Sequence, residues 1–175
     1  MRYCESPFLY HRRKTREVVV GDPARGGVVI GGDNPVVVQS MLTCDTMDTE
    51  ESVKQTLDLV AVGCQIVRIT APTVKDAANL QHIVTELRAR DCNVPIVADI
   101  HFHYKLALMA LEAGIDKLRL NPGNIGAHER VREVVRAAQA QKVPIRIGVN
   151  GGSLEKDLLK KYGTATPEAM VESAM

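Results

Sequence analysis

Three arginines occupy equivalent positions in three short segments of alternating polar and apolar residues. Arg68 lies in Ile-Val-Arg-Ile-Thr, Arg119 in Lys-Leu-Arg-Leu-Asn and Arg146 in Ile-Arg-Ile-Gly-Val-Asn. Residues two apart share one face of a β-strand, so each arginine lies on the polar face of its segment. Guanidinium groups bind phosphate oxygens through paired N–H donors and stay charged at every relevant pH. Convergence of the three predicts a diphosphate site, and the alternative is internal ion pairing with Asp99 or Asp116.

An acidic, an imidazole and two amide side chains accompany the arginines. Asp99 and His101 are two residues apart in Ala-Asp-Ile-His-Phe-His and therefore share a strand face. They would orient or protonate a bound hydroxyl or phosphate oxygen, or else form a structural polar pair. Asn121 and Asn150 each end a strand, where an amide binds a ligand oxygen or caps the following turn.

Both asparagines precede a glycine-rich turn. Pro122-Gly123-Asn124-Ile125-Gly126 follows Asn121, and Gly151-Gly152-Ser153 follows Asn150. The proline ends the first strand because it lacks an N–H, and the glycines allow backbone N–H groups to approach an anion. Two such turns, each leading into a helix N-terminus, predict that backbone amides hold a phosphate oxygen.

The segments that carry these residues belong to a regular alternation of strands and helices. Strands are predicted over 36–41, 66–70, 95–100, 117–121 and 144–149. Helices are predicted from 48 or 49 to about 63 and over 74–90, 104–113, 129–141, 154–161 and 167–173. The repeat of roughly 25–30 residues is that of a βα unit. Two short β-prone runs at 17–20 and 28–30 predict a hairpin before the first unit.

The two faces of the strands distinguish between two α/β architectures. In a doubly wound sheet both faces are buried and apolar, whereas in the last four predicted strands one face is apolar and the other ends in polar residues. Polar inner residues at the strand ends are typical of the active-site mouth of a barrel. The sequence therefore predicts a partial (β/α)8 TIM barrel of about five βα units, preceded by an N-terminal β-hairpin.

The predicted domain organisation is a polar N-terminal arm over 1–16 and a barrel portion over 17–175. Because a closed barrel needs eight strands in about 250 residues, we expect this chain to be the N-terminal part of a longer protein.

Composition excludes several classes of function. The net charge is +1 and only 3% of the residues are aromatic, which argues against nucleic-acid and membrane-surface binding. No apolar run reaches the roughly 18 residues of a membrane span. The cysteines lack metal-site spacing, which predicts no metal ligand and a reducing compartment, the cytoplasm. They are Cys4, Cys44, Cys64 and Cys92.

Several of these segments resemble the 4-hydroxy-3-methylbut-2-enyl diphosphate synthase family of the non-mevalonate isoprenoid (terpenoid) pathway. The resemblance extends from about residue 13 to the end of the chain. The matching segments are Val-Gln-Ser-Met (38–41), Ile-Val-Arg-Ile-Thr (66–70), Val-Ala-Asp-Ile-His-Phe (97–102), Lys-Leu-Arg-Leu-Asn-Pro-Gly-Asn-Ile-Gly (117–126) and Ile-Arg-Ile-Gly-Val-Asn-Gly-Gly-Ser-Leu-Glu (145–155).

The resemblance implies an N-terminal TIM barrel and a C-terminal domain with a 4Fe–4S cluster. It implies an oxidoreductase that opens 2-C-methyl-D-erythritol 2,4-cyclodiphosphate reductively to 4-hydroxy-3-methylbut-2-enyl diphosphate. Two electrons come from ferredoxin or flavodoxin, and water is lost. Family members are commonly homodimers in which the cluster domain of one subunit covers the barrel of the other.

By the same resemblance, the barrel mouth of this chain would bind the diphosphate. The residues implied are Arg68, Asp99, His101, Arg119, Asn121, Arg146 and Asn150. No catalytic residue is assigned. The cysteines of this chain do not match the family's cluster ligands, so no metal ligand is transferred and the chain alone is not expected to catalyse. Two alternatives stay open: a pterin-type synthase barrel without a cluster, and an inactive truncated fragment.

Overall fold

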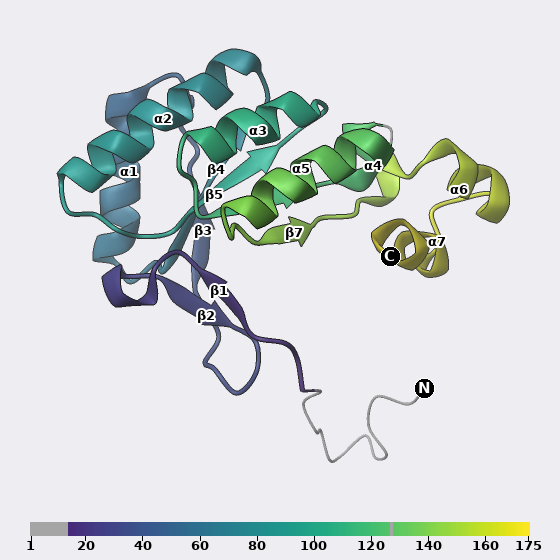
Figure 1. Ribbon diagram of the computed structural model, residues 1–175, viewed down its shortest axis with the longest axis horizontal. Helices are drawn as coiled ribbons and strands as arrows, with labels where there is room; N and C mark the ends of the chain where they lie inside the picture. The colour runs from purple at the N-terminus through teal and green to yellow at the C-terminus, as the bar shows by residue number, and fades with distance from the viewer. Residues whose placement is uncertain (1–13, 127) are drawn as a thin grey trace.

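A parallel five-stranded sheet organises the protein. The computed structural model describes residues 14–126 and 128–175 (Figure 1). Residues 1–13 of the arm predicted over 1–16 therefore lie outside the described residues. The strands follow one another across the sheet in chain order. They are β3 (Gln39–Met41), β4 (Ile66–Ala71), β5 (Ile96–Ile100), β6 (Lys117–Leu120) and β7 (Ile145–Ile147). The prediction of a partial barrel of about five βα units is confirmed, and the sheet is not closed.

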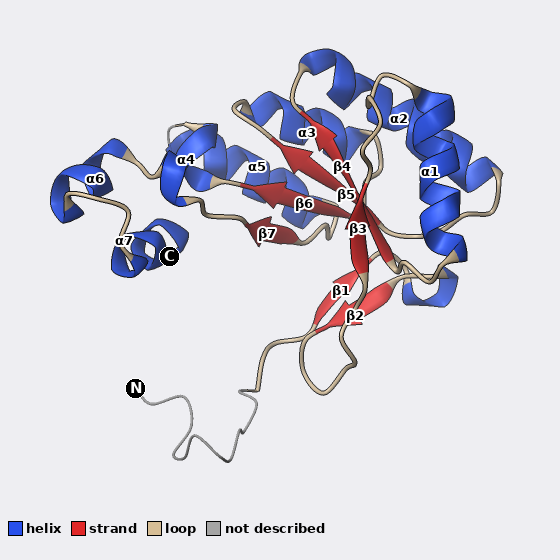
Figure 2. Ribbon diagram, turned by 180° about the vertical axis from the view of Figure 1, so that it is seen from behind, coloured by secondary structure: helices blue, strands red, loops and turns tan. Residues whose placement is uncertain are grey.

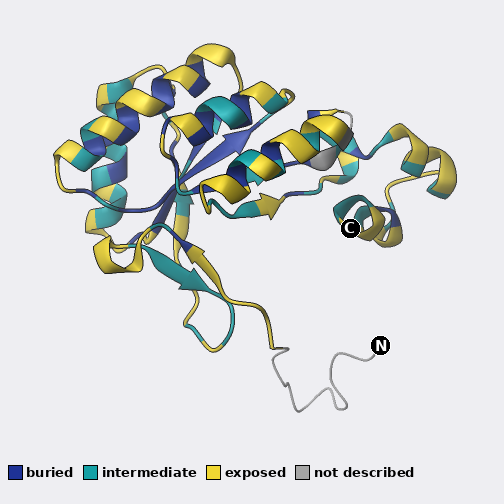
Figure 3. Cartoon of the chain, viewed as in Figure 1, coloured by how far each residue is buried: buried dark blue, intermediate teal, exposed yellow. Residues whose placement is uncertain are grey.

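Four helices cover one face of this sheet (Figure 2). They are α1 (Thr49–Ala61), α2 (Val74–Ala89), α3 (Tyr104–Glu112) and α5 (His128–Ala140). The outward strand residues Ile69, Ala98 and Leu118 are fully buried beneath them. Burial of each larger side chain stabilises the folded state by about 1.5–3 kcal/mol. The apolar face of the strands therefore packs against the helices, and Figure 3 shows the buried strands beneath them.

Local capping sets the starts of the helices as the sequence indicates. The Asp48 carboxylate accepts from the Glu51 amide at 3.0 Å and begins α1. Thr73 begins α2 with a capping box, in which the Asp76 side chain returns a bond to the Thr73 amide. These caps satisfy backbone N–H groups that have no partner within the helix.

An antiparallel hairpin precedes the sheet, as predicted. It consists of β1 (Val18–Val20) and β2 (Val28–Ile30), with Val19 opposite Val29. Val20 is fully buried, and a side chain at Gly21 would meet Pro95 at 3.1 Å. Since Pro95 directly precedes β5, the hairpin packs at the amino-terminal end of the sheet, opposite the predicted site.

Apart from shifts of one or two residues at other element ends, the structure differs from the sequence-based prediction in three places. The first strand begins at Gln39 rather than at residue 36; the Val38 amide bonds to the Gln65 side chain at 3.0 Å, while the Val38 carbonyl accepts from the Gln65 and Ile66 amides. The turn after β6 contains a one-turn helix, α4 (Pro122–Ile125). The helix predicted from 154 begins later, as α6 (Lys156–Tyr162), because Leu154 has an extended backbone with ψ 149°. The last helix is α7 (Pro167–Ala174).

The amino-terminal end of the sheet contains a partly buried ion pair between Arg88 and Asp116. Arg88 donates to Asp116 at 2.9 Å and to the backbone carbonyl of Cys92 at 2.8 Å. Asp116 also accepts from the Ile96 amide at 2.8 Å. Burial raises the pKa of Asp116, opposed by the Ile96 amide and the Arg88 charge.

We expect Arg88→Met to lower the free energy of unfolding by about 1–3 kcal/mol, since it leaves a half-buried carboxylate without its cation. Urea unfolding of the full-length protein measures this. Arg90→Met is the matched control on the same helix end, because Arg90 pairs only with the exposed Glu86 at 2.8 Å; its expected cost is under about 0.5 kcal/mol. Equal costs for the two variants would contradict the prediction.

No helix among the described residues combines the length and the apolar character that crossing a lipid bilayer requires.

Candidate functional site

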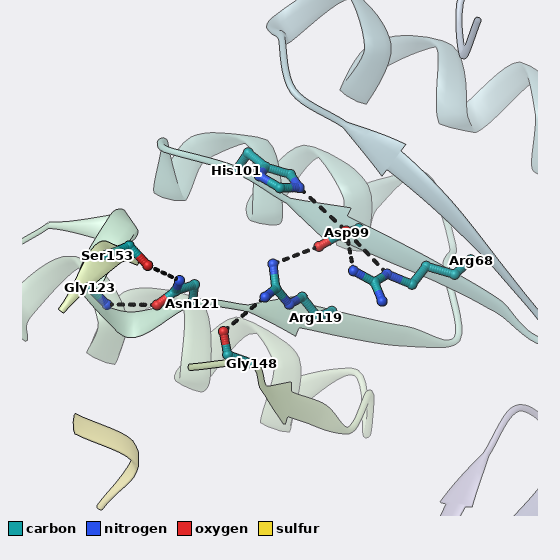
Figure 4. A network of polar contacts seen from close by, with 8 residues as sticks. All are labelled: Arg68, Asp99, His101, Arg119, Asn121, Gly123, Gly148 and Ser153. Carbon is teal, nitrogen blue, oxygen red and sulfur yellow. Dashed lines mark hydrogen bonds and ion pairs between the residues drawn. The ribbon is translucent and has the colours of Figure 1, made fainter. Parts of the chain in front are cut away.

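Parallel pairing brings most of the predicted site residues to one face of the sheet, near the carboxyl ends of its strands. Figure 4 shows Arg68, Asp99, His101, Arg119 and Asn121. Asp99 lies opposite Thr70 on one side and Arg119 on the other, and Arg119 lies opposite Arg146. Because all five strands run in the same direction, their carboxyl ends share this edge. The face is the one that the helices leave uncovered.

Asp99 is the centre of the site. Its Oδ2 accepts from Arg68 Nε at 3.1 Å and also from Arg68 Nη2, and its Oδ1 accepts from Arg119 Nη1 at 3.1 Å. His101 Nε2 lies 3.3 Å from Oδ2. The Asp99 side chain is only 3% exposed. Of the two carboxylates considered from the sequence, Asp99 is the one that pairs with these arginines.

The charge state of Asp99 follows from its neighbours. Burial alone raises the pKa of this carboxyl, but the hydrogen bond and charge of Arg68, with the charges of Arg119 and His101, bring the pKa below its usual value. Asp99 is therefore ionised at neutral pH and fixes the positions of both guanidinium groups.

The face carries more positive than negative charge. Arg146 is exposed and makes no ion pair with any described residue. Lys117 is buried on the same face, where burial and the nearby Arg146 charge lower its pKa. Three guanidinium groups thus share this face with one carboxylate, Asp99. The excess of positive charge favours a ligand with more than one negative charge.

Gly148 determines the position of the Arg119 guanidinium. Arg119 Nη2 donates to the Gly148 carbonyl oxygen at 2.9 Å. A Cβ at position 148 would overlap Nε of Arg119 and lie 2.8 Å from its Cζ. A larger residue at position 148 would therefore displace the guanidinium from its position between the Gly148 carbonyl and Asp99 (Figure 4).

Asn121 joins the turns that follow β6 and β7. Its Nδ2 donates to Ser153 Oγ at 2.6 Å, and its Oδ1 accepts from the Gly123 amide at 3.2 Å. A side chain at Gly123 would collide with the carbonyl oxygen of Ser153. The two turns are therefore packed backbone against backbone.

The glycine-rich turns differ in one respect from the sequence-based expectation. The amides of Gly123 and Gly152 do not face open space: each donates to the asparagine two residues earlier, Asn121 at 3.2 Å and Asn150 at 3.0 Å. The reason is that an asparagine side chain closes a local turn with the amide two residues on. These two amides therefore hold the asparagine side chains in place.

The structure brings together some of the seven predicted residues and separates others. Four form the Asp99 cluster, and Asn121 lies further along the same face. Arg146 and Asn150 are exposed and make no hydrogen bond to that cluster among the described residues. The four clustered residues are Arg68, Asp99, His101 and Arg119.

Sequence reasoning did not assign the roles of Ser153 and of the Gly148 carbonyl. The serine follows two glycines, a signal for a turn rather than for a partner of Asn121. A backbone carbonyl leaves no signature in the sequence. The glycine at 148, one residue before the end of the strand predicted over 144–149, was the available signal, because a glycine in a strand often marks a close backbone approach.

Metal-ligating side chains are dispersed over residues 14–126 and 128–175, where no three of them gather closely enough to hold a metal ion. Two cysteines make weak polar contacts instead. Cys64 Sγ donates to the Ile66 carbonyl at 3.1 Å, and Cys44 Sγ lies 3.4 Å from Ser52 Oγ.

Comparison with known proteins gives closely similar sequences. The chain is 54% identical over 169 residues to 4-hydroxy-3-methylbut-2-en-1-yl diphosphate synthase (flavodoxin) of Exiguobacterium sibiricum, which covers 97% of this chain and 43% of that protein. Its identity to the enzymes of the same name is 53% over 167 residues in Symbiobacterium thermophilum and 52% over 173 residues in Chromohalobacter salexigens. These matches cover 95% and 99% of this chain, and 42% and 43% of the relatives.

The chain thus spans less than half the length of these relatives. A family model described as the GcpE TIM-barrel domain matches residues 15–175. This range contains all five parallel strands, the hairpin and every residue of the Asp99 cluster. The chain therefore belongs to the GcpE TIM-barrel domain family.

Proposed function

We propose that this chain supplies the diphosphate-binding part of an enzyme of isoprenoid biosynthesis. The reaction is the reductive ring opening of 2-C-methyl-D-erythritol 2,4-cyclodiphosphate to 4-hydroxy-3-methylbut-2-enyl diphosphate. Two electrons and two protons are consumed, a C–O bond is broken and water leaves. Support comes from relatives named as this synthase, all more than half identical to the chain, and none of the three carries a pterin-synthase name.

The single observation that carries the proposal is the Asp99 cluster. Two guanidinium groups held 3.1 Å from one buried carboxylate have fixed positions before a ligand arrives. Each still has N–H donors to offer, since an arginine carries five. Pre-positioned donors bind a diphosphate without the entropic cost of ordering long side chains.

In this proposal the residues of the chain bind and orient the ligand. Arg68 and Arg119 take the phosphate oxygens nearest Asp99, and Arg146 takes those toward solvent. His101 donates a hydrogen bond to a phosphate or hydroxyl oxygen, while Asn121 and Asn150 line the same mouth. The chain contributes binding and orientation, and no catalytic proton donor is assigned to it.

The family implies a 4Fe–4S cluster, which when bound supplies the electrons. The described residues do not fit it, because no three metal-ligating side chains come together among them. We therefore derive no step through the cluster, and the proposal assigns its ligands to residues outside this chain. The electron donor is proposed to be flavodoxin, as the relatives' names print it, or ferredoxin. We further propose that the full-length protein is a homodimer in the cytoplasm and has no nucleic-acid or membrane partner.

The proposal is tested on the gene product purified from its source. Its intact mass is compared with the 19.1 kDa of these residues, and the protein is assayed for conversion of the cyclodiphosphate with reduced flavodoxin. A larger mass with turnover supports the synthase. A mass of 19.1 kDa without turnover would leave the truncated-fragment alternative and remove the enzymatic proposal for this chain.

Arg146 provides a prediction that separates binding from stability. We expect Arg146→Ala to weaken cyclodiphosphate binding about tenfold or more, equivalent to roughly 1.4 kcal/mol for a lost charge-assisted bond. The melting temperature without ligand stays unchanged, because Arg146 is exposed and makes no ion pair among the described residues. Calorimetric titration measures the affinity. Arg132→Ala, an exposed arginine on α5, is the control and leaves affinity unchanged; a similar loss in both variants would contradict the assignment.

A further inference from the structure

Phe102 has a conformation and an exposure that the fold alone does not explain. It lies two residues beyond β5, with a φ angle of +63°. The His103 amide donates to the His101 carbonyl at 2.8 Å, which closes a three-residue γ-turn around Phe102. A γ-turn with positive φ at its centre is rare and strained, and a bulky side chain makes it more so.

This arrangement reduces the stability of the fold in two ways. A non-glycine residue held in the left-handed region costs about 1–3 kcal/mol, which glycine would avoid. The phenylalanine side chain is also 69% exposed, so it gains little of the roughly 1.5–3 kcal/mol that full burial provides. Strain of this kind is characteristic of ligand-binding positions, where the ligand rather than the core makes use of the residue.

The turn separates two histidines with different tasks. His101 contacts Asp99 at 3.3 Å. His103 instead accepts from the Lys105 amide at 3.2 Å, which begins α3, and its ring stacks on Tyr104. The sharp reversal at Phe102 allows one ring to join the site and the next to cap a helix.

The Phe102 ring lies beside the charged cluster. Its centroid is 5.7 Å from that of His101, with the planes tilted by 49°, within the range of favourable aromatic pairs. The His101 imidazole itself lies 3.3 Å from Asp99 Oδ2, so the phenyl ring is the direct neighbour of a member of the cluster (Figure 4 shows His101 and Asp99). A ligand whose phosphates bind the arginines would have its carbon atoms next to the ring.

We propose that Phe102 is a specificity-determining residue that forms the apolar wall for the carbon skeleton of an organic diphosphate. This inference rests on the function proposed above. The arginines recognise any diphosphate, inorganic pyrophosphate included, because they contact only phosphate oxygens. A ring exposed beside them distinguishes a ligand with carbon atoms from one without, by burying apolar surface that pyrophosphate does not have.

The test compares two ligands in three forms of the full-length protein. The wild type, Phe102→Gly and Phe102→Leu are titrated calorimetrically with 2-C-methyl-D-erythritol 2,4-cyclodiphosphate and with inorganic pyrophosphate. We expect Phe102→Gly to weaken binding of the cyclodiphosphate about tenfold or more, a difference of 1.4 kcal/mol, and to leave pyrophosphate binding within about twofold. Phe102→Leu keeps an apolar side chain and restores part of the difference.

Lys142→Gly is the matched control. Lys142 also has a left-handed backbone, with φ 58°, but it lies at the amino-terminal side of β7, away from the mouth. The Lys142→Gly substitution relieves the same kind of backbone strain and should leave the affinities for both ligands unchanged. Thermal unfolding checks that every variant is folded. An equal loss for both ligands in Phe102→Gly, or no loss, would overturn the inference while the proposed function stands. A wild type that binds pyrophosphate but not the cyclodiphosphate would overturn both.

Discussion

Asp99→Asn is expected to lower the free energy of unfolding by about 3–5 kcal/mol, because among the described residues it removes the only carboxylate that Arg68 and Arg119 share. The side chain keeps its shape, so the loss comes from charge and not from a cavity. Inorganic pyrophosphate at a concentration well above its Kd restores part of the stability, since its negative charge replaces that of Asp99. Urea unfolding of the full-length protein with and without pyrophosphate measures both effects.

Asp45→Asn is the control, because Asp45 is exposed and, among the described residues, its side chain accepts a hydrogen bond only from the Met47 amide, at 2.9 Å. Its effect should stay under about 0.5 kcal/mol. A stability of Asp99→Asn equal to that of the control would show that the arginines do not depend on Asp99. So would a pyrophosphate effect no larger than in the wild type.

The pH dependence of the wild type gives an independent check of the same carboxylate. Its pKa is lowered in the folded protein, so the stabilisation is complete above the ordinary aspartate pKa of about 3.9 and disappears as the pH falls through the lowered value. The Asp99→Asn variant lacks this contribution, and the stability difference between the two proteins should shrink below about pH 4.

Gly123→Ala is expected to cost about 1–3 kcal/mol, because its methyl group would collide with the backbone carbonyl of Ser153, which has no rotamer to change. The two turns must then separate, and the bond of 2.6 Å between Asn121 and Ser153 breaks. Hydrogen exchange of the amides in both turns should accelerate together. Urea unfolding and exchange mass spectrometry of the full-length protein measure the two effects.

Gly152→Ala is the matched control for this prediction. Gly152 also follows an asparagine by two residues and donates to it, at 3.0 Å, but an added Cβ would meet nothing closer than Asn150 Oδ1 at 3.6 Å. Its cost should stay below about 0.5 kcal/mol. The same loss in both variants would show that glycine flexibility, and not the contact with Ser153, is what the turns require.

The order of the elements and the faces of the strands could be predicted from the sequence because they depend on local periodicity. The alternation around Arg68, Asp99 and Arg119 requires only that residues two apart share a face. Parallel pairing of successive βα units then brings these side chains to one edge. The convergence of these residues could therefore be predicted without distance information, whereas ion pairing with Asp99 was only the alternative to phosphate binding.

The details of the turns could not be predicted, because they depend on competing hydrogen bonds between distant residues. Asn121 bonds to the Gly123 amide and to the Ser153 hydroxyl, and Ser153 is 32 residues away along the chain. The first strand begins at Gln39, and the Val38 amide before it bonds to the side chain of Gln65, which is 27 residues away along the chain. The choice of Asp99 rather than Asp116 as the arginine partner likewise depends on which end of the sheet each carboxylate occupies.

The contact between Arg119 and Gly148 has a consequence for the evolution of the chain. Since a Cβ at 148 would overlap the guanidinium, any larger residue there requires that the arginine at 119 be lost or displaced first. Conversely, the three atoms nearest to such a Cβ all belong to Arg119, so loss of this arginine removes them. The two positions, 29 residues apart in the sequence, therefore constrain each other. In a relative that has lost the arginine at 119, we expect residue 148 to vary as well.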